Sequence, residues 1–526
     1  MGHLFIVRGN LTHLSCDAWL MPTDASVDVN RHWFRETGPS YEDWKRPDLR
    51  NEPDWGDTGR RVHRVENWPE GLPEPWLTNT GGILGTRAEW FAEGAVAFLE
   101  AAARHLEGKS PRNGRARHLL AMPLVGTGAG GAYRKAGEIL EILMPRIFRF
   151  LEDRPVDAAI VLFDDVSFSA AQAVRAALST SMKVWPRELD GGLQTAALHL
   201  ADHCVQSRLV LFMGAGIGSA AGLPQWGGLL KELADEVGLG AQEAATDFGK
   251  LSLPDQAVLV ELRCMRLGLN LGQVIADMLD RQKHISLSHA LLAGLPVRET
   301  VTTNYDRLFE LASRGAGWEA AVIPYSPARD KRRWLLKLHG CVSRPEDIVL
   351  TRTDYIRYQE RRAALRGIVQ AMLMTRHMLF VGFSLTDDNF HRIVDEVRRA
   401  RMGEDREQGR AAESRLGTCL SIDTNRAFQE LWSTDLDWLA MDGPGRSPRE
   451  SARVLEIFLD YVGAAVASKT AHICDPRFEA ALSSGDRALV GLLSSLVADS
   501  IGDARRSAAW PQVESMLREL GWKKAD

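Results

Sequence analysis

Four segments of the sequence place glycines or polar side chains directly after an apolar run, where a fold can present groups that do chemistry. The first is a glycine cluster at 214–218, which follows the apolar run 209–213. Glycines in such a place allow a tight turn and let backbone N–H groups approach a pyrophosphate, although a plain tight turn has the same composition. The other three segments carry Asn304 with Asp306, then His339, then Gly382 with Ser384.

The residue types in these segments suit proton transfer and the holding of hydroxyl groups. The side chain of Asn304 offers both a hydrogen-bond donor and an acceptor. His339 titrates near neutral pH and is therefore able to serve as a general base. Each residue taken singly also fits a capped turn or a satisfied core position. Their shared placement after apolar runs favours one ligand site, because ligands of open α/β sheets bind at the carboxyl ends of the strands.

The elements that must position these residues form a pattern of strands alternating with helices. The run LVLFM at 209–213 is typical of a strand buried on both faces of a parallel sheet. A helix is expected at about 193–206, and a long helical insert is expected between the glycine cluster and residue 290. This alternation predicts a doubly wound α/β unit. Further strands are expected at about 298–303, 320–323, 334–339, 347–351, 377–383 and 418–422.

The N-terminal part of the chain shows the same alternation and predicts an α/β unit of its own. A stretch that includes Pro47, Pro69 and Pro75 is expected to be rich in loops. A second glycine cluster, at 126–131, follows one of the predicted strands. Strands are expected at 3–7, 17–22, 118–125 and 158–163, and helices at 87–106, at 134–152 and from about Ser169 onward.

The chain is expected to divide into four parts: 1–180, a linker at 181–192, 193–445, and a helical segment at 446–526. The last part has apolar residues at helical spacing, which must be buried either on the same chain or between copies of it. One such face carries Val454, Leu455, Phe458, Leu459, Val462 and Val466, and another carries Leu489, Leu492, Leu493, Leu496 and Val497.

Composition excludes several classes of protein. Of the 526 residues 45% are hydrophobic and 25% are charged, which excludes a largely disordered chain. No apolar run approaches the roughly 18 to 20 residues of a membrane span, and the first residues show no secretory signal. The net charge of −5 argues against a broad nucleic-acid-binding face. The six cysteines include no CxxC pair, so no metal site is expected, and a reducing cytoplasm is the expected compartment.

Residues 214–224, GAGIGSAAGLP, resemble the first NAD-binding motif of sirtuins. In the order of that family, TNYD at 303–306 resembles its Asn-x-Asp element, LHG at 338–340 its His-Gly element, and GFSL at 382–385 its Gly-Thr-Ser-Leu element. The resemblance covers about 205–442 and is closer to the bacterial sirtuin-like branch than to the protein deacylases. Many members of that branch are NAD-consuming effectors of anti-phage defence.

The sequence departs from the sirtuin pattern in two places. Gln225-Trp226-Gly227 stands where sirtuins carry Asp-Phe-Arg. Residues 341–376, where the zinc module of the deacylases normally follows, contain a single cysteine, Cys341. Because that module helps to form the acyl-lysine groove in the family, both departures count against a protein substrate.

The resemblance implies that NAD+ is the substrate and that no metal is needed. Breaking the nicotinamide–ribose bond develops positive charge on the ribose, and neutral nicotinamide leaves without a strong acid. Asp306 then accepts from the carboxamide NH₂, Asn304 holds a water or a ribose hydroxyl, and His339 takes a proton from a ribose hydroxyl or the attacking water. Asp423 is placed to meet the adenosine ribose, with the N-cap of a helix at 424–433 as the alternative. The phosphates are expected on Gly214, Ala215, Gly216, Gly218, Ser219, Gly382 and Ser384.

The N-terminal unit has a resemblance of its own, to macrodomains. GNLTHLSCDAWLMPTD at 9–24 is similar to the opening of a macrodomain, and PLVGTGAGG at 123–131 resembles its phosphate loop. Asn10 stands where an adenine-binding Asp is usual, and Pro22-Thr23-Asp24 replaces the Asn-rich catalytic loop. The resemblance spans 1–180 and implies binding of an ADP-ribose-like ligand, or a purely structural role, rather than ADP-ribosyl hydrolysis.

The combined expectation is a macrodomain-like α/β/α unit followed by a Rossmann-like sirtuin unit that hydrolyses NAD+ to nicotinamide and linear or cyclic ADP-ribose. The implied role is depletion of NAD on phage infection, by a homo-oligomer that a nucleotide or a partner protein regulates. A HerA-type ATPase, an Argonaute-like protein or a TIR protein are the partners that the resemblance suggests. Two other classes stay as alternatives: an ADP-ribosyltransferase or protein deacylase, and a non-catalytic sensor of NAD or ADP-ribose.

Overall fold

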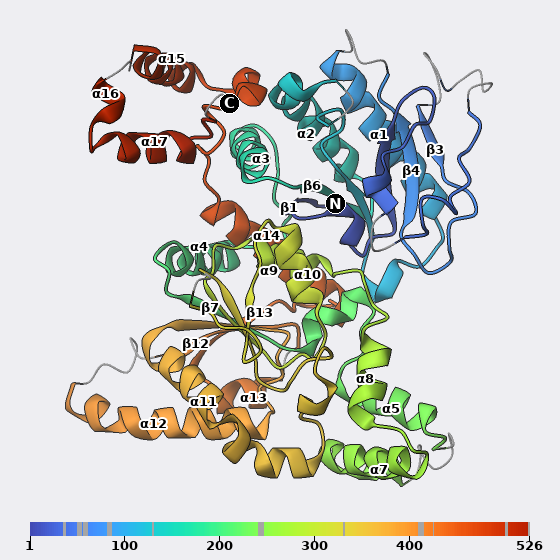
Figure 1. The fold of residues 1–526 in the computed structure, drawn as a ribbon, viewed down its shortest axis with the longest axis vertical. Coiled ribbons are helices and arrows are strands. Elements are labelled where there is room, and N and C mark those ends of the chain that lie inside the picture. The colour runs from blue at the N-terminus through green and yellow to red at the C-terminus, as the bar shows by residue number, and fades with distance from the viewer. Residues whose placement is uncertain are drawn as a thin grey trace. The chain divides into compact units, whose positions relative to one another are not determined.

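The chain forms two compact units in the computed structural model, whose elements are labelled in Figure 1. Unit 1 comprises Met1–Asp190, Gly315–Gly317 and Gly463–Asp526, and unit 2 comprises Gly191–Arg314 and Trp318–Val462. The structure describes residues 1–34, 38–49, 55, 61–81, 87–128, 131–239, 247–329, 332–408, 415–423, 425–499 and 503–523.

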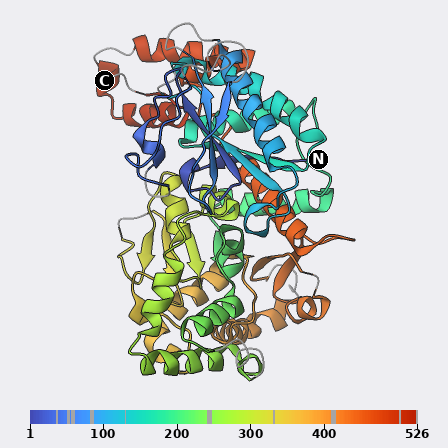
Figure 2. The ribbon, with the colours of Figure 1, turned by 90° about the vertical axis from the view of Figure 1, so that its right-hand side faces the viewer.

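Unit 1 is built on a six-stranded sheet with the order β1-β6-β5-β2-β4-β3 (Figure 2, blue to cyan strands). All of its strand pairs are parallel except that of β3 with β4 at one edge. The strands are β1 (Leu4–Arg8), β2 (Ala18–Thr23), β3 (Val62–Arg64), β4 (Glu74–Asn79), β5 (His118–Met122) and β6 (Val156–Leu162). Four of them, and the parallel α/β pattern, are those that the sequence predicted.

Two strands of this sheet, β3 and β4, lie in the stretch that the sequence predicted to be rich in loops. β4 contains Pro75, but this proline is the second residue of the strand and lies beyond the part that pairs with β3. A proline near the start of a strand removes no N–H that the ladder needs, so β4 tolerates it. The sequence did not predict β3 and β4 within this loop-rich stretch, because Pro73 and Pro75, which mark the beginning of β4, are also loop signals.

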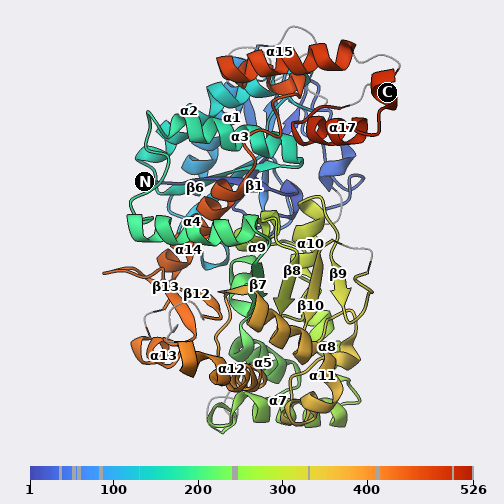
Figure 3. The ribbon, with the colours of Figure 1, turned by 90° about the vertical axis from the view of Figure 1, so that its left-hand side faces the viewer.

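Three helices cover one face of the unit 1 sheet: α1 (Ala88–Leu106), α2 (Ala136–Glu152) and α3 (Asp165–Leu178) (Figure 3). Alternate strand residues such as Leu4 and Ile6 point into this core, as the period of a strand requires. Phe91 and Phe98 of α1 fill it from the helix side and are almost completely buried. Phe478 of the C-terminal segment belongs to the same core.

Unit 2 is built on a seven-stranded sheet in which every strand pair is parallel, with the order β13-β12-β11-β7-β8-β10-β9. Figure 3 shows β13, β12, β7, β8, β10 and β9 following one another across it. The strands are β7 (Leu209–Met213), β8 (Glu299–Thr302), β9 (Ala321–Ile323), β10 (Trp334–Lys337), β11 (His377–Val381), β12 (Gly417–Ser421) and β13 (Leu436–Ala440). The doubly wound prediction holds for the sheet.

Two strand assignments in unit 2 were wrong. The run at 347–351 is not a strand, although Ile348 and Leu350 are buried. They belong to the core cluster of the helical insert and are buried against it. The apolar residues at 347–351 are therefore explained by packing on helices and not by pairing in the sheet. β13 was missed, since it lies at the edge of the sheet, carries Asp437 and has only its first residue buried.

Some helices of unit 2 pack on the sheet, and others form the insert between β7 and β8. Alternate residues of β7 and β11 pack against α11 (Arg352–Thr375) and α12 (Asp388–Gln408), while α4 (Gly191–Val205) contacts β7. The predicted insert between β7 and β8 is helical and holds a core of its own. Its helices are α5 (Trp226–Glu236), α7 (Leu253–Arg266) and α8 (Leu271–Leu279), and α9 (Leu287–Gly294) and α10 (Leu308–Gly315) flank β8.

The C-terminal segment is helical, as predicted: α14 (Pro448–Val466), a 3₁₀ turn η8 (Pro476–Ala481), α15 (Ser484–Asp499), α16 (Asp503–Arg506) and α17 (Trp510–Glu519). The apolar face of α14 is buried, whereas Leu489, Leu492 and Leu496 of α15 are 43%, 71% and 45% exposed. Among the described residues no helix is long and apolar enough to cross a membrane.

Replacing Phe478 by Ala should destabilise unit 1 by about 3–5 kcal/mol, the usual cost of removing a buried phenylalanine ring. The ring has no exposed surface, and Gly137 of α2 lies against its backbone, so the site has little room to collapse. Urea unfolding of the full chain measures the change. Leu492→Ala on the exposed face of α15 is the control and should shift the midpoint little; equal shifts in both variants would contradict the assignment of Phe478 to the core.

Candidate functional site

The four segments singled out in the sequence leave neighbouring strands at one level. Met213 at the end of β7 pairs with Val381 at the end of β11 and with Thr302 at the end of β8. Thr302 in turn pairs with Lys337 at the end of β10. The segments that follow these four residues therefore start side by side at the carboxyl edge of the sheet, which is where open α/β sheets bind ligands.

Glycines are required here because two of these segments pack backbone against backbone. A Cβ atom on Gly214 would lie 2.5 Å from the carbonyl oxygen of Gly382, and one on Gly216 would lie 2.8 Å from its Cα. The amide of Gly216 donates to the same carbonyl at 2.9 Å. Gly382 also has a φ of +63°, which residues other than glycine rarely adopt. The glycine cluster and the Gly382 turn thus form one continuous surface.

The glycine cluster runs into a 3₁₀ helix, η5 (Ala215–Ala221), which ends at Gly222 in the left-handed conformation. Ala215, Gly218 and Ser219 lie on this turn. The Oγ atom of Ser219 is buried, and no hydrogen-bond partner for it is found among the described residues. A regular helix, α5, begins only at Trp226.

Asn304 ties the segment after β8 to the glycine cluster. Its side-chain Nδ2 donates to the carbonyl of Gly214 at 3.2 Å, and its backbone N–H donates to Thr302 Oγ1 at 3.0 Å. Asp306 is buried, and one carboxylate oxygen accepts from the N–H of Leu308 at 2.9 Å, at the start of α10. One of the two carboxylate oxygens of Asp306 is therefore already hydrogen-bonded to the protein backbone.

His339 lies two residues after β10 and is only 5% exposed. Its Nε2 atom is 3.5 Å from Oδ2 of Asp387, which also accepts from the hydroxyl of Tyr355 at 3.0 Å. The rings of Tyr355 and Tyr358 stand edge-on to the imidazole, each with centroids 5.8 Å away. Burial lowers the pKa of His339 below its ordinary value, and the charge of Asp387 opposes that shift only in part.

Sequence reasoning missed Asp387 and Tyr355. Asp387 follows the Gly382 element and caps α12, because its Oδ1 accepts from the N–H of Phe390 at 2.8 Å. A carboxylate two residues after the Gly-Phe-Ser-Leu run was a signal that could have been used. Tyr355 comes from α11, and nothing in its local sequence pointed to the site.

The remaining predicted residues lie at the margin. Ser384 is exposed, and its hydroxyl shares a hydrogen bond with Thr386 at 2.7 Å. Asp423 is also exposed, two residues beyond the end of β12, which is the neighbour of β11. The alternative role of Asp423 as a helix cap was wrong, because Asn425 caps α13 (Arg426–Leu431) by accepting from Phe428 N at 3.0 Å.

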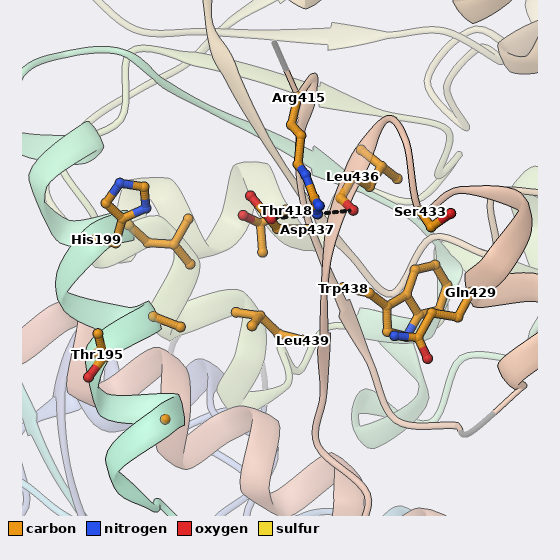
Figure 4. A pocket seen from close by; sticks show the side chains of 13 residues that line it. Thr195, His199, Arg415, Thr418, Gln429, Ser433, Leu436, Asp437, Trp438 and Leu439 are labelled. Atoms are coloured by element: carbon orange, nitrogen blue, oxygen red, sulfur yellow. Dashed lines mark hydrogen bonds and ion pairs between the residues drawn. The ribbon is translucent and has the colours of Figure 1, made fainter. Parts of the chain in front are cut away.

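A separate hollow of about 630 Å³ lies beside α4 and the edge strands of the unit 2 sheet. In Figure 4 the side chains of Arg415 and Asp437 lie next to each other on one side of it, paired at 2.7 Å. None of the predicted site residues lines it. Arg415 and Asp437 are paired with each other, whereas Thr195 and Ser433 donate to the backbone carbonyls of Gly191 and Glu430. In the described part of the chain no three His, Cys, Asp or Glu side chains are grouped so as to bind a metal ion.

The second glycine cluster lies in unit 1, after β5. Gly126 has a φ of +85°, and a Cβ atom there would meet the ring of Phe91 at 2.4 Å. Ala129 and Gly130, in the middle of the cluster, lie outside the described residues. Asn10 caps the 3₁₀ turn η1 (Leu11–His13) by accepting from Thr12 N at 3.1 Å.

Solved structures of macrodomains resemble part of the chain. The Oceanobacillus iheyensis macrodomain with ADP is 17% identical, with a TM-score of 0.25, and the match covers 34% of this chain and 93% of that one. The same macrodomain with MES bound gives 16% identity and a TM-score of 0.25, with the same coverage.

Relatives named as NAD(+) hydrolases and as a defense-associated sirtuin match part of the chain. NAD(+) hydrolase ThsA of Bacillus cereus (strain MSX-D12) is 32% identical over 204 residues, which are 37% of this chain and 41% of that protein. NAD(+) hydrolase ThsA of Enterococcus faecium is 32% identical over 202 residues, 36% of this chain and 39% of that protein. Defense-associated sirtuin 2 of Bacillus subtilis is 24% identical over 225 residues, 40% of this chain and 21% of that protein.

The chain thus spans about two fifths of the length of the two NAD(+) hydrolases that it matches. The model of a family described as the SIR2-like domain matches residues 298–418. That range runs from the start of β8 into β12 and includes Asn304, His339 and Asp387. The part of unit 2 that carries these residues is accordingly similar in sequence to SIR2-like domains.

Proposed function

We propose that the protein is an NAD+ hydrolase, which releases nicotinamide and leaves ADP-ribose. The observation that carries this proposal is the placement of Asn304 and His339, each two residues beyond the end of one of two adjacent parallel strands, with Asn304 hydrogen-bonded to the glycine cluster. The similarity to two NAD(+) hydrolases and to SIR2-like domains supports it.

In this proposal the glycine surface binds the phosphates of NAD+. The turn at 214–218, with the hydroxyl groups of Ser219 and Ser384, is proposed to lie against the pyrophosphate. The amides of Gly214 and Gly216 already donate to the carbonyls of Val381 and Gly382, so the rest of the turn supplies the proposed contacts. Asp423, beyond the neighbouring strand β12, takes the adenosine ribose. The buried hydroxyl of Ser219 has no partner among the described residues, which supports a role in binding.

The nicotinamide end of NAD+ then lies toward Asn304, Asp306 and His339. Asp306 accepts from the carboxamide, and Asn304 holds a ribose hydroxyl or the attacking water. Because burial lowers the pKa of His339, its neutral form predominates at neutral pH and is able to accept the proton from that hydroxyl or water. Asp387 orients the imidazole and stabilises it once it is protonated. Nicotinamide leaves as a neutral molecule, so no acid is required.

Hydrolysis is preferred to protein deacylation or ADP-ribosyl transfer on one observation. The segment after His339 packs into the core of the helical insert through Cys341, Val342, Ile348 and Leu350. It is thereby committed to internal packing, and it holds no second cysteine with which to build the deacylase zinc module. The reaction is therefore proposed to need no metal.

The proposed biological role is the depletion of NAD in the cytoplasm as a defence against phage, since one relative is a defense-associated sirtuin and others are NAD(+) hydrolases. Such an enzyme must be held inactive until it is triggered. Oligomerisation through the exposed leucines of α15 is one proposed device. A partner protein, such as a HerA-type ATPase, an Argonaute-like protein or a TIR protein, or an ADP-ribose-like ligand of unit 1, is the proposed trigger.

Asn304→Ala and His339→Ala should each lower NAD+ cleavage by about 10²-fold or more, which is typical of losing a positioning group or a general base. Free nicotinamide is measured with purified protein and no acceptor, in the presence of EDTA. Unchanged melting temperatures are the control for folding. Wild-type turnover in either folded variant would rule out the assignment, and release only with an acylated peptide would favour deacylation instead.

Asp387→Asn should move the acidic limb of the pH profile of kcat/KM to lower pH. The carboxylate is the group that raises the pKa of His339, so its loss lowers that pKa further. The rate should also fall by roughly tenfold or more, because the imidazolium loses its counter-charge. Tyr355→Phe is the control, since it removes only the hydroxyl that donates to Asp387. A limb that stays in place in Asp387→Asn would exclude the pairing.

Gly128→Glu should abolish binding of ADP-ribose to unit 1. A side chain at Gly128 meets no atom within 4 Å, so the fold is preserved while the new carboxylate repels a diphosphate. Calorimetry on the full chain, in a His339→Ala background, measures the number of sites. Gly128→Ala is the matched variant and should bind ADP-ribose both at unit 1 and at the proposed NAD+ site of unit 2. If Gly128→Glu also binds at both places, ADP-ribose does not bind at this loop.

A further inference from the structure

Lys337, the last residue of β10, is an unusual side chain for the interior of a sheet. None of its surface is exposed, and it lies two residues before His339. Burial of an ammonium group is costly unless it is paired and hydrogen-bonded. A lysine in this position therefore needs a reason that an apolar residue of the same volume would not satisfy.

The ammonium group is fully engaged. It lies 3.0 Å from Oε1 of Glu310 on α10 and donates to the backbone carbonyl of Asp306. A longer contact of 3.5 Å reaches the carbonyl of Tyr305. Burial by itself would lower the pKa of Lys337, but Glu310, Cys341 and Asp306 together outweigh it, and the pKa is raised above the ordinary value of 10.5. The side chain therefore stays charged at neutral pH.

These contacts close a ring around the segment that carries Asn304. Asp306 caps the start of α10 by accepting from Leu308 N, Glu310 lies one turn further along, and Lys337 connects Glu310 back to the carbonyl of Asp306. The same strand, β10, leads directly to His339. The ring thus links the two sides of the candidate site through one side chain.

We propose that Lys337 is a positioning residue, which holds residues 305–306 against β10 and so fixes Asn304 and Asp306 relative to His339. The proposal rests on the proposed NAD+ hydrolysis for its kinetic consequence. It predicts that losing the donors of Lys337 affects the chemical step more than the binding of NAD+, because the phosphate-binding glycines belong to other strands.

A double variant separates positioning from simple stability. Lys337→Met leaves Glu310 buried without its partner and is expected to fold poorly. In Lys337→Met with Glu310→Leu both charges are gone, and such apolar replacements of buried ion pairs are often neutral or stabilising. The double variant should therefore fold, yet it cannot donate to the carbonyl of Asp306.

The expected result for the double variant is a kcat lowered by roughly 10- to 100-fold with KM for NAD+ changed by no more than about threefold, as for a misplaced catalytic group. Backbone amides at 303–308 should also exchange faster with deuterium in full-length protein. Arg398→Met with Asp435→Asn removes an ion pair of 2.6 Å at the other edge of the sheet and serves as the matched control for both measurements.

A folded double variant with wild-type kcat and wild-type exchange would overturn the proposal. The proposal would also fail if adding Glu310→Leu to Lys337→Met restored kcat to the same extent as it restored the melting temperature. Lys337 would then act through stability alone. If the wild-type chain cleaves no NAD+, the proposed function fails, and the exchange of 303–308 still decides whether Lys337 holds that segment.

Discussion

The shared register of four parallel strands is the constraint on which the candidate site depends. A parallel sheet brings all its carboxyl ends to one edge, but the level at which each strand ends is set by its pairing. Met213, Thr302, Lys337 and Val381 occupy one level across β11, β7, β8 and β10. A slip of one residue in any pairing would turn that strand's side chains to the opposite face. The buried apolar faces of the strands prevent such a slip, so the hydrophobic core of unit 2 fixes the site geometry.

Two kinds of interaction hold the loops at this edge of the sheet: backbone packing and side-chain hydrogen bonds. The glycine cluster and the Gly382 turn are joined by backbone contact alone, with no side chain between them. The segment around Asn304 is held by side chains, among them the buried Lys337. The first kind needs glycines, because a side chain would separate the two segments, and the second fixes the orientation of the polar side chains. The division matches the different demands of binding a charged ligand and placing a proton acceptor.

The sequence predicted most of the sheet and the placement of Asn304 and His339 just beyond the ends of neighbouring strands, because apolar strand runs and the residues that end them are local signals. It failed where the structural reason is not local. The strand containing Pro75 resembles a loop until its neighbours are known, and 347–351 resembles a strand because its burial against the helical insert cannot be read from composition. Asp387 was missed for a similar reason, since its partnership with His339 exists only once α12 and β10 are brought together.

The position of Phe478 in the core of unit 1 has a consequence for biosynthesis. The strands and first three helices of that core are complete at Leu178, whereas Phe478 emerges about 300 residues later. At translation rates of about 5–20 residues per second, the N-terminal unit waits roughly 15 to 60 s for its last core residue. During that interval its partly covered apolar surface is available to chaperones. Completion of the N-terminal unit thus becomes a late event, which follows synthesis of the entire NAD-cleaving unit that we propose.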